Sequence, residues 1–174
     1  IIQTFSNSGW LPSVLMTTAR GDARQFAIDY HDKTDLIVVS GGDGTLNEVI
    51  DGLVSCGGNC NIGYIPSGST NDFATSMGLP KGVVAAAERA VTGSPRTLDL
   101  GSFNGRLFTY IASLGAVTAT SYSVPQNLKN LLGHTAYILQ GAKDIVNIKP
   151  IHIKLVADEG TPNERVCEGD YIFG

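Results

Sequence analysis

A glycine-rich loop is the first feature of the sequence that could do chemistry. Residues 41–45 read Gly-Gly-Asp-Gly-Thr and follow a run of mostly β-branched residues, 36–40. Because glycine lacks a Cβ atom, backbone N–H groups of such a loop can close around phosphate oxygens, and a following helix adds partial positive charge. Asp43 would repel a bare phosphate, so it suits a site in which Mg²⁺ lies between them or in which it accepts a proton from an attacking hydroxyl. The alternative is a tight turn in which Asp43 caps a helix starting at Thr45.

A second polar loop, residues 66–72, follows the next predicted strand. It reads Pro-Ser-Gly-Ser-Thr-Asn-Asp and places hydroxyls, an amide and a carboxylate ahead of a helix. Two such loops at the ends of adjacent parallel strands would converge on one cleft. For Asn71 and Asp72 the alternative is an ordinary helix N-cap. Thr17 ends another predicted strand and adds a hydroxyl at the same edge, although a β-branched residue is also routine in a strand.

Alternating strands and helices position these loops. One helix is predicted over residues 23–30, because apolar residues recur there at helical spacing. Asp22 is its predicted N-cap. Another follows the glycine-rich loop, since Val49 and Leu53 share a face, and Gly52 together with Gly57-Gly58 marks its weakening end. This alternation implies βαβ crossovers and a mainly parallel sheet. Strands are predicted at 14–18, 36–40, 62–65 and 96–100, and further helices from Asp72 and over 83–91.

The pattern changes near residue 100. Asn104-Gly105 between apolar runs predicts a hairpin, and residues 148–156 and 165–173 predict a second one, after a helical interval over 126–145. The predicted fold class is therefore α/β. A Rossmann-like parallel-sheet domain, residues 1–98, precedes the start of an antiparallel, β-rich, sandwich-like domain, residues 99–174.

Composition excludes several classes of protein. The 174 residues are 43% hydrophobic and 16% charged, against about 25% charged in an average soluble domain, which excludes a disordered chain. The net charge is −4 and no basic run occurs, so no nucleic-acid partner is expected. The 22 uncharged residues between Arg106 and Lys129 hold too many polar groups for a transmembrane segment. We also predict no signal peptide, and reduced thiols at Cys56, Cys60 and Cys167.

Charge also divides along the chain. Residues 1–100 carry 6 basic and 10 acidic residues, whereas 106–154 carry five basic residues against Asp144 alone. The second segment could face an anionic membrane surface. The alternative is a solvated face.

Three motifs together resemble a known family. Residues 39–49 read Val-Ser-Gly-Gly-Asp-Gly-Thr-Leu-Asn-Glu-Val, residues 66–74 read Pro-Ser-Gly-Ser-Thr-Asn-Asp-Phe-Ala, and residues 98–101 read Leu-Asp-Leu-Gly. The chain resembles the diacylglycerol kinase catalytic domain, in its bacterial lipid kinase branch. The glycine-aspartate motif alone is also shared with NAD kinases and phosphofructokinases.

The resemblance implies a function and a set of site residues. The function is transfer of the γ-phosphoryl group of Mg-ATP to the hydroxyl of diacylglycerol or a related lipid, with ATP and Mg²⁺ required. The implied essential carboxylates are Asp43, Asp72 and Asp99, with Asp43 also as the metal ligand. The implied nucleotide contacts are Thr17, Gly41, Gly42, Asp43, Gly44, Thr45, Leu46, Asn47, Glu48, Ser69 and Asn71.

The chain also departs from the family pattern. Ser69 stands where the family usually has threonine, which keeps the hydroxyl. The family's first strand is absent before Ile1, and the segment expected to carry the general base is absent after Gly174, so we expect an inactive fragment of a lipid kinase. That kinase is expected in the cytoplasm, in peripheral contact with the inner membrane face, with a homodimer left open. The alternatives are a soluble NAD kinase-like enzyme and a non-catalytic nucleotide-binding module.

Overall fold

The computed structural model describes residues 1–113 and 150–172. The chain divides into two compact units, Ile1–Ile111 and Ala112–Gly174, which are described separately. The first unit holds both polar loops. The domain boundary after Leu98 stays a prediction.

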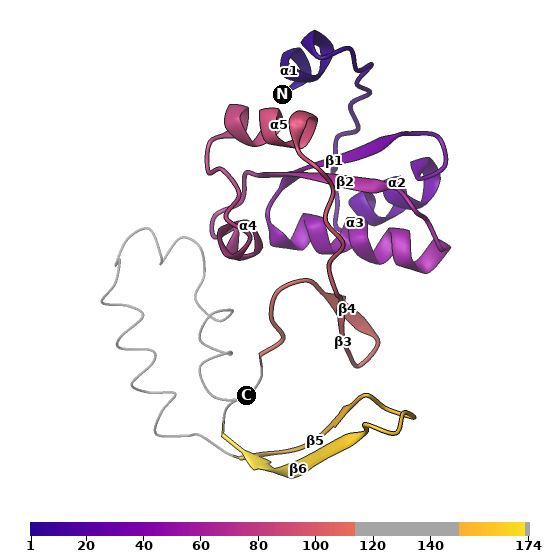
Figure 1. Cartoon of the computed structure of the whole chain (residues 1–174), viewed down its shortest axis with the longest axis vertical. Helices are drawn as coiled ribbons and strands as arrows, with labels where there is room; N and C mark the ends of the chain where they lie inside the picture. The colour runs from indigo at the N-terminus through magenta and orange to yellow at the C-terminus, as the bar shows by residue number, and fades with distance from the viewer. Residues whose placement is uncertain (114–149, 173–174) are drawn as a thin grey trace, which may run out of the picture. The chain divides into compact units, whose positions relative to one another are not determined.

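A parallel pair of strands forms the centre of the first unit (Figure 1). Strand β1 (Leu36–Gly41) pairs with β2 (Asn61–Pro66) along their whole lengths. Helix α3 (Asp43–Cys56) makes the crossover between them, as parallel pairing requires. The predicted βαβ unit is confirmed. Because both strands run in the same direction, the loops that follow them leave the sheet at the same edge.

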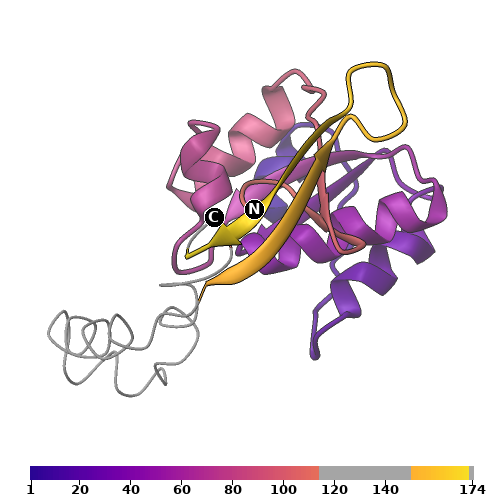
Figure 2. The ribbon, with the colours of Figure 1, turned by 90° about the horizontal axis from the view of Figure 1, so that it is seen from below.

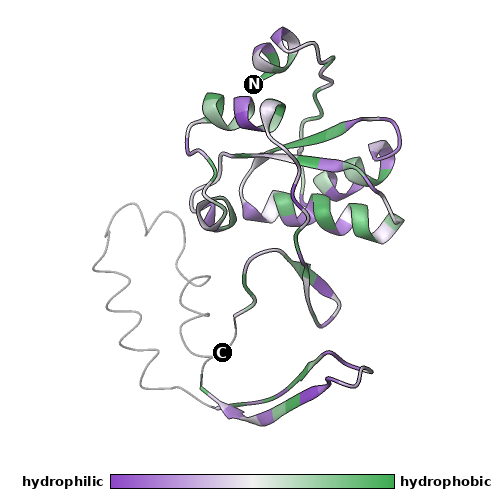
Figure 3. Cartoon of the chain, viewed as in Figure 1, coloured by the Kyte–Doolittle hydropathy of each residue, from purple (hydrophilic) through white to green (hydrophobic). Residues whose placement is uncertain are grey.

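Helices cover both faces of this strand pair (Figures 1 and 2). Val39 and Tyr64 are register partners on the face buried by α2, α3 and α4, whereas Ile65 points to α1 and α5. The alternation of side chains along β2 explains this split, because neighbouring residues of a strand face opposite sides. Figure 3 shows the apolar residues of β1 and β2 between these layers. The bounds of the remaining helices are α1 (Ile2–Asn7), α2 (Asp22–Tyr30), α4 (Asp72–Ser76) and α5 (Val83–Thr92).

Helix α3 carries the glycine-rich loop into its first turn. Its apolar stripe is buried at Leu46, Val49 and Leu53, as the spacing predicts. The helix begins at Asp43, with Gly42 as the N-cap residue and no side-chain cap. Asp43 therefore does not cap its own helix, and the alternative that made it a cap of a helix starting at Thr45 is wrong.

Gly52 lies where α3 contacts α2 and does not weaken the helix. The helix ends at Cys56, with Gly57 (φ +67°) as the C-cap residue, so the predicted end at Gly57-Gly58 is confirmed. A Cβ atom at Gly52 would lie 2.5 Å from the carbonyl oxygen of Arg24 and 3.0 Å from Cβ of Ala27. We expect Gly52→Ala to lower the free energy of unfolding by about 2 kcal/mol, because overpacking outweighs the higher helix propensity of alanine. Urea denaturation measures this. Gly44→Ala in the same helix meets nothing within 4 Å and should be neutral or stabilising, so equal losses in the two variants would contradict the packing argument.

The predicted strand over 14–18 is not present. This segment carries no strand pairing, and its apolar side chains are exposed, Met16 at 76%. A strand needs a neighbour for its backbone hydrogen bonds, and no described segment pairs with this one. Its end is held instead by Asp22, whose Oδ2 accepts the N–H groups of Thr18 (2.6 Å) and Ala19 (2.8 Å). Those hydrogen bonds hold the pKa of the Asp22 carboxyl below its usual value.

Asp22 is the first residue of α2 and not its cap, a position taken by Gly21 with a φ of +94°. Because the strand over 14–18 is absent, the predicted placement of Thr17 at a sheet edge is wrong. Thr17 lies in the exposed segment before α2.

The predicted strand over 96–100 is also wrong in position. Residues 93–100 form no strand, and pairing begins at β3 (Gly101–Phe103), which is antiparallel to β4 (Arg106–Phe108). Asn104 and Gly105 have φ values of +49° and +74°, the left-handed pair that a tight two-residue turn requires. The Asn-Gly hairpin prediction is confirmed, whereas the leucines before it have no described strand to pair with.

In the second unit, β5 (Ile151–Ala157) and β6 (Arg165–Tyr171) form the predicted antiparallel hairpin. His152 lies between Asp170 (2.9 Å) and Glu168 (3.2 Å), whose hydrogen bonds raise the pKa of this histidine. The predicted helical interval over 126–145 lies outside the described residues. The three cysteines are free, as predicted.

Candidate functional site

The loops after β1 and β2 meet at one edge of the sheet. The N–H of Ser67 donates to the carbonyl oxygen of Gly41 (2.9 Å), and the hydroxyls of Ser40 and Ser67 are 3.4 Å apart. Gly68 lies directly against Gly42, since a Cβ atom at Gly68 would be 2.5 Å from Cα of Gly42. The predicted convergence of the two loops is confirmed.

Asp43 joins the first loop to the helix that follows the second. Its Oδ2 accepts the N–H of Asp72 (3.0 Å) and its Oδ1 accepts the N–H of Phe73 (3.2 Å). These are the first two residues of α4, so a carboxylate 29 residues earlier in the chain satisfies N–H groups that have no partner within that helix. Asp43 and Asp72, two of the predicted carboxylates, are thus brought together.

Asn71 shapes the second loop. Its φ is +53°, and its side chain makes no cap bond to α4. The side-chain Oδ1 instead accepts the N–H of Gly68 (2.9 Å), and Nδ2 donates to the carbonyl oxygen of Gly68 (2.8 Å). This pair of hydrogen bonds fixes the part of the loop that presses on Gly42. Asn71 is the N-cap residue of α4, as the alternative predicted, and its carbonyl oxygen accepts the N–H of Thr75 (3.0 Å), but its side chain does not cap the helix.

The remaining residues of the glycine-rich motif divide into open and engaged positions. Gly44 is exposed, and a Cβ atom there would meet nothing within 4 Å. Thr45 packs its side chain over Gly41, whose Cβ would lie 2.8 Å from Thr45 Oγ1. Asn47 Oδ1 accepts the hydroxyl of Thr109 (3.1 Å). Backbone approach is therefore open at Gly44, whereas Thr45 and Asn47 already contact neighbouring parts of the unit.

Glu48 and Leu46 lie deeper. Glu48 Oε2 accepts the N–H of Gly21 (3.0 Å), which ties α3 to the start of α2. Leu46 is 2% exposed and belongs to the core. Ser69 lines a separate cavity of about 250 Å³ beside Asn71 and Lys81. The nucleotide contacts implied for these residues and for Thr17 stay predictions.

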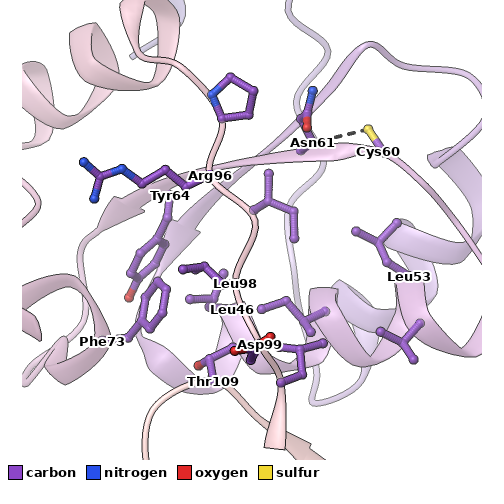
Figure 4. A pocket seen from close by; sticks show the side chains of 15 residues that line it. Leu46, Leu53, Cys60, Asn61, Tyr64, Phe73, Arg96, Leu98, Asp99 and Thr109 are labelled. Atoms are coloured by element: carbon purple, nitrogen blue, oxygen red, sulfur yellow. Dashed lines mark hydrogen bonds between the residues drawn. The ribbon is translucent and has the colours of Figure 1, made fainter. Parts of the chain in front are cut away.

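A cavity of about 310 Å³ lies between α3, β2 and the segment that carries Asp99 (Figure 4). Tyr64 is the residue here that the sequence analysis missed. Its ring is 6.0 Å from that of Phe73, and its side chain is 8% exposed. Burial, and then the negative charge of Asp43, raises the pKa of Tyr64 to about 12. The hydroxyl is therefore protonated at neutral pH, and it has no hydrogen-bond partner among the described residues.

A signal for Tyr64 exists in the sequence. It is a residue with a polar tip inside an apolar strand that ends at the second loop. Buried hydroxyls nearly always find a partner, so a tyrosine in such a strand marks either an internal hydrogen bond or a binding site.

Mg²⁺ suits the donors at this edge. Each carboxylate oxygen of Asp43 accepts one N–H group of α4. A carboxylate has about four lone-pair sites, so about two remain for a metal ion. Within residues 1–113 and 150–172, no three His, Cys, Asp or Glu side chains form a metal-binding cluster. Mg²⁺ commonly binds through one or two carboxylates together with waters and substrate phosphates. Asp43 is thus a fitting ligand for a metal that arrives with a phosphate.

A parallel strand pair with glycine-rich and hydroxyl-rich loops at one edge, and a carboxylate between them, is an arrangement typical of α/β domains that bind phosphate groups. The particular family follows from comparison with known proteins. The family model described as "Diacylglycerol kinase catalytic domain" matches residues 1–103, and the chain belongs to this family.

Curated relatives agree with this family. The chain is 38% identical over 160 residues to a diacylglycerol kinase of Bacillus subtilis (strain 168), covering 91% of the chain and 53% of the relative. It is 31% identical over 160 residues to the diacylglycerol kinase of Staphylococcus saprophyticus, covering 91% and 52%. The chain therefore spans about half the length of these relatives.

Solved structures give the same result. A crystal structure of a diacylglycerol kinase from Bacillus anthracis str. Sterne superposes with a TM-score of 0.71 at 26% identity, covering 99% of this chain and 55% of that one. A second structure from the same organism has a TM-score of 0.76 at 27% identity, covering 99% and 56%. In the described part of the chain, no helix is both long and apolar enough to cross a membrane.

Proposed function

We propose that the protein containing this chain is a lipid kinase, which transfers the γ-phosphoryl group of ATP to the hydroxyl of diacylglycerol or a related lipid. The observation that carries the proposal is the position of the Asp43 carboxylate, which accepts hydrogen bonds from the first two N–H groups of α4 where the two loops meet. The relatives from Bacillus subtilis and Staphylococcus saprophyticus are diacylglycerol kinases, which supports diacylglycerol as the acceptor. They also favour a lipid over NAD, the acceptor in the alternative enzyme.

The loops divide the work of holding the nucleotide. The open backbone at Gly44 and Gly42 is suited to the phosphate oxygens. Asp43 would hold Mg²⁺, which neutralises charge on the transferring phosphoryl group when bound. Asn71 positions the second loop through Gly68, and Ser69 is proposed as a further nucleotide contact. Phosphoryl transfer depends mainly on such positioning and on electrostatic stabilisation.

The remaining implied residues stay part of the proposal. Asp72 and Asp99 are proposed as essential carboxylates. Asp72 lies beside Asp43, whereas Asp99 lines the 310 Å³ cavity. Thr17 is proposed as a nucleotide contact from the resemblance alone, and a homodimer is proposed as one assembly.

The test offers the full-length protein radiolabelled ATP together with mixed lipids and, separately, NAD. The proposal expects labelled phosphatidate or a related phospholipid, separated by chromatography, and no labelled NADP. Label in NADP alone would favour the soluble alternative. Tight nucleotide binding without any labelled product would favour the non-catalytic module.

A lipid acceptor also requires contact with a membrane, and we propose that the enzyme works in the cytoplasm and visits the inner membrane face. Residues 106–154 carry net charge +4 in sequence, although Lys129, Lys143 and Lys149 lie outside the described residues. Each basic residue near an anionic surface contributes about 1 kcal/mol, screened beyond about 8 Å at physiological salt.

We therefore expect the full-length protein to co-sediment with anionic vesicles at low salt and to be released at high salt. The variant in which these three lysines are replaced by glutamate should sediment poorly. Lys33→Glu, which lies in the N-terminal part of the sequence outside the basic segment, should sediment as wild type does. Equal sedimentation of the triple variant and wild type would show that the basic segment does not contribute to membrane binding.

A further inference from the structure

The second cavity, of about 250 Å³, lies beside the loop that follows β2 and has a mostly polar lining. Three hydroxyls, one amide and one ammonium group face it, from Ser69, Thr70, Thr75, Asn71 and Lys81. Among the described residues that line it, none is acidic. The cavity therefore presents hydrogen-bond donors and one positive charge, without a carboxylate to oppose an anion.

Lys81 has no compensating carboxylate. It forms no ion pair within the described residues, although residues 1–100 carry 10 acidic residues against 6 basic ones. Asp72 belongs to the same loop as the hydroxyls but does not line the cavity. A lysine ammonium is a compact point charge that commonly binds phosphate. The charge of Lys81 is thus available to an anion that enters the cavity.

Ser69 and Thr70 add donors that the fold does not use. Within the described residues, neither their hydroxyls nor their backbone N–H groups have an acceptor. The other polar groups are engaged, because the Asn71 side chain is hydrogen-bonded within the loop and the Thr75 hydroxyl donates to the Asn71 carbonyl oxygen (3.1 Å). The first two N–H groups of α4 are accepted by Asp43. The free donors therefore belong to the loop and not to the helix end.

The size of the cavity limits which anion fits. A volume of about 250 Å³ corresponds to about eight groups of the size of water, at about 30 Å³ each. A phosphate group fills about five of these, which leaves room for a short ester-linked group, whereas a whole nucleotide is too large. A phosphate monoester also has three strong acceptor oxygens and a charge of about −2. These oxygens match the Lys81 ammonium and the two free hydroxyls in number.

We propose that this cavity binds the phosphate group of a small phosphate monoester, with Lys81 as the anchoring cation and Thr70 and Ser69 as hydrogen-bond donors. The site is separate from the place proposed for the nucleotide phosphates at Gly42 and Gly44, and it does not depend on the lipid kinase function. Ser69 borders both places, so Lys81 and Thr70 are the residues that belong to the cavity alone. The same chemistry occurs in a soluble ester such as glycerol 3-phosphate and in the headgroup of phosphatidate.

The first test titrates the full-length protein with glycerol 3-phosphate by calorimetry. We expect Lys81→Met and Thr70→Val each to raise the Kd by at least about 10-fold, as for the loss of one hydrogen bond to a charged group. Lys81→Arg keeps the charge and should bind nearly as wild type does. Lys33→Met is the matched control, since Lys33 is an exposed lysine of the same unit and does not line the cavity. Lys81 and Thr70 are exposed, so their variants should keep the fold.

A second titration uses protein saturated with Mg²⁺ and a non-hydrolysable analogue of ATP. Glycerol 3-phosphate should still bind, because its site is separate from that of the nucleotide. Lys81→Met should leave the affinity for the analogue as in wild type. Loss of glycerol 3-phosphate binding in the presence of the analogue would show that both occupy one place, and would overturn the second site.

Two further probes identify the source of the phosphate. Inorganic phosphate should bind more weakly than glycerol 3-phosphate, because it leaves part of the cavity empty; an equal Kd would overturn the ester and leave a site for the free ion. Phosphatidylcholine vesicles that contain phosphatidate are compared with vesicles carrying the same charge as phosphatidylserine. A preference for phosphatidate that Lys81→Met abolishes assigns the site to the lipid headgroup. Glycerol 3-phosphate binding through Lys81 without that preference assigns it to a soluble ester.

The outcomes keep this site distinct from the proposed kinase function. Equal affinity of wild type and Lys81→Met for glycerol 3-phosphate, or no binding by wild type, overturns the site and leaves the lipid kinase intact. Binding through Lys81 by a protein that labels no lipid from ATP supports the site and overturns the lipid kinase.

Discussion

Asp43→Asn should lower phosphoryl transfer by on the order of 10³-fold, the largest effect we expect from a single isosteric change. The amide is uncharged, so it is a weaker ligand for Mg²⁺ than the carboxylate, and it cannot act as a proton acceptor. It can also accept through only one oxygen, whereas the carboxylate accepts the N–H groups of Asp72 and Phe73 through two. The variant should therefore also lose about 1.5–3 kcal/mol of stability, in keeping with one hydrogen bond to a charged group.

The measurement is turnover of radiolabelled ATP with diacylglycerol by the full-length protein, alongside urea denaturation. Asp51→Asn is the matched control, because Asp51 lies on the same helix and pairs with Arg24 (2.6 Å) away from the loops. That exposed pair contributes less than about 1 kcal/mol, so turnover should stay near wild type. Near-normal turnover in Asp43→Asn would remove Asp43 from the transfer step.

The local pattern of the sequence was enough to predict the βαβ unit and both hairpins. The β-branched run before the glycine-rich loop and the Asn-Gly turn each specify one local conformation, and both predictions are confirmed. Residues 14–18 and 96–100 have equally strand-like composition but no described partner strand. Pairing is a tertiary property, so a short apolar run predicts the capacity to form a strand and not its partner.

The site shows the same limit at finer scale. Sequence predicted that the loops converge, because parallel strands end at one edge. The sequence could not predict that the Asp43 carboxylate accepts an N–H of α4, or that the Asn71 side chain is hydrogen-bonded to Gly68. Both contacts depend on how the two loops fold in space. Gly42 is not needed for a positive φ, because its φ is −92°. Its lack of a side chain matters through the contact with Gly68.

Gly68→Ala tests that contact directly. A Cβ atom at Gly68 would lie 2.5 Å from Cα of Gly42, 3.1 Å from its backbone nitrogen, and 2.9 Å from Oδ1 of Asn71. The first two neighbours are backbone atoms, so the loops must separate to admit even one methyl group. We expect a loss of about 1–3 kcal/mol of stability from overpacking, and a rise in the Kd for Mg-ATP of at least 10-fold, because the two loops no longer present their groups together.

Two further glycine variants separate packing from ligand contact, with stability followed by urea denaturation and nucleotide binding by calorimetry. Gly44→Ala, which meets nothing within 4 Å, should keep full stability but weaken Mg-ATP binding if the backbone there approaches phosphate. Gly82→Ala, at the N-cap position of α5 and equally open, should cost about 1 kcal/mol of stability or less and should leave Mg-ATP binding as in wild type. If Gly68→Ala binds Mg-ATP as wild type does while losing stability, the contact between the loops holds the fold together but does not build the nucleotide site. If it loses neither, the two loops tolerate separation, and their convergence has no role in binding.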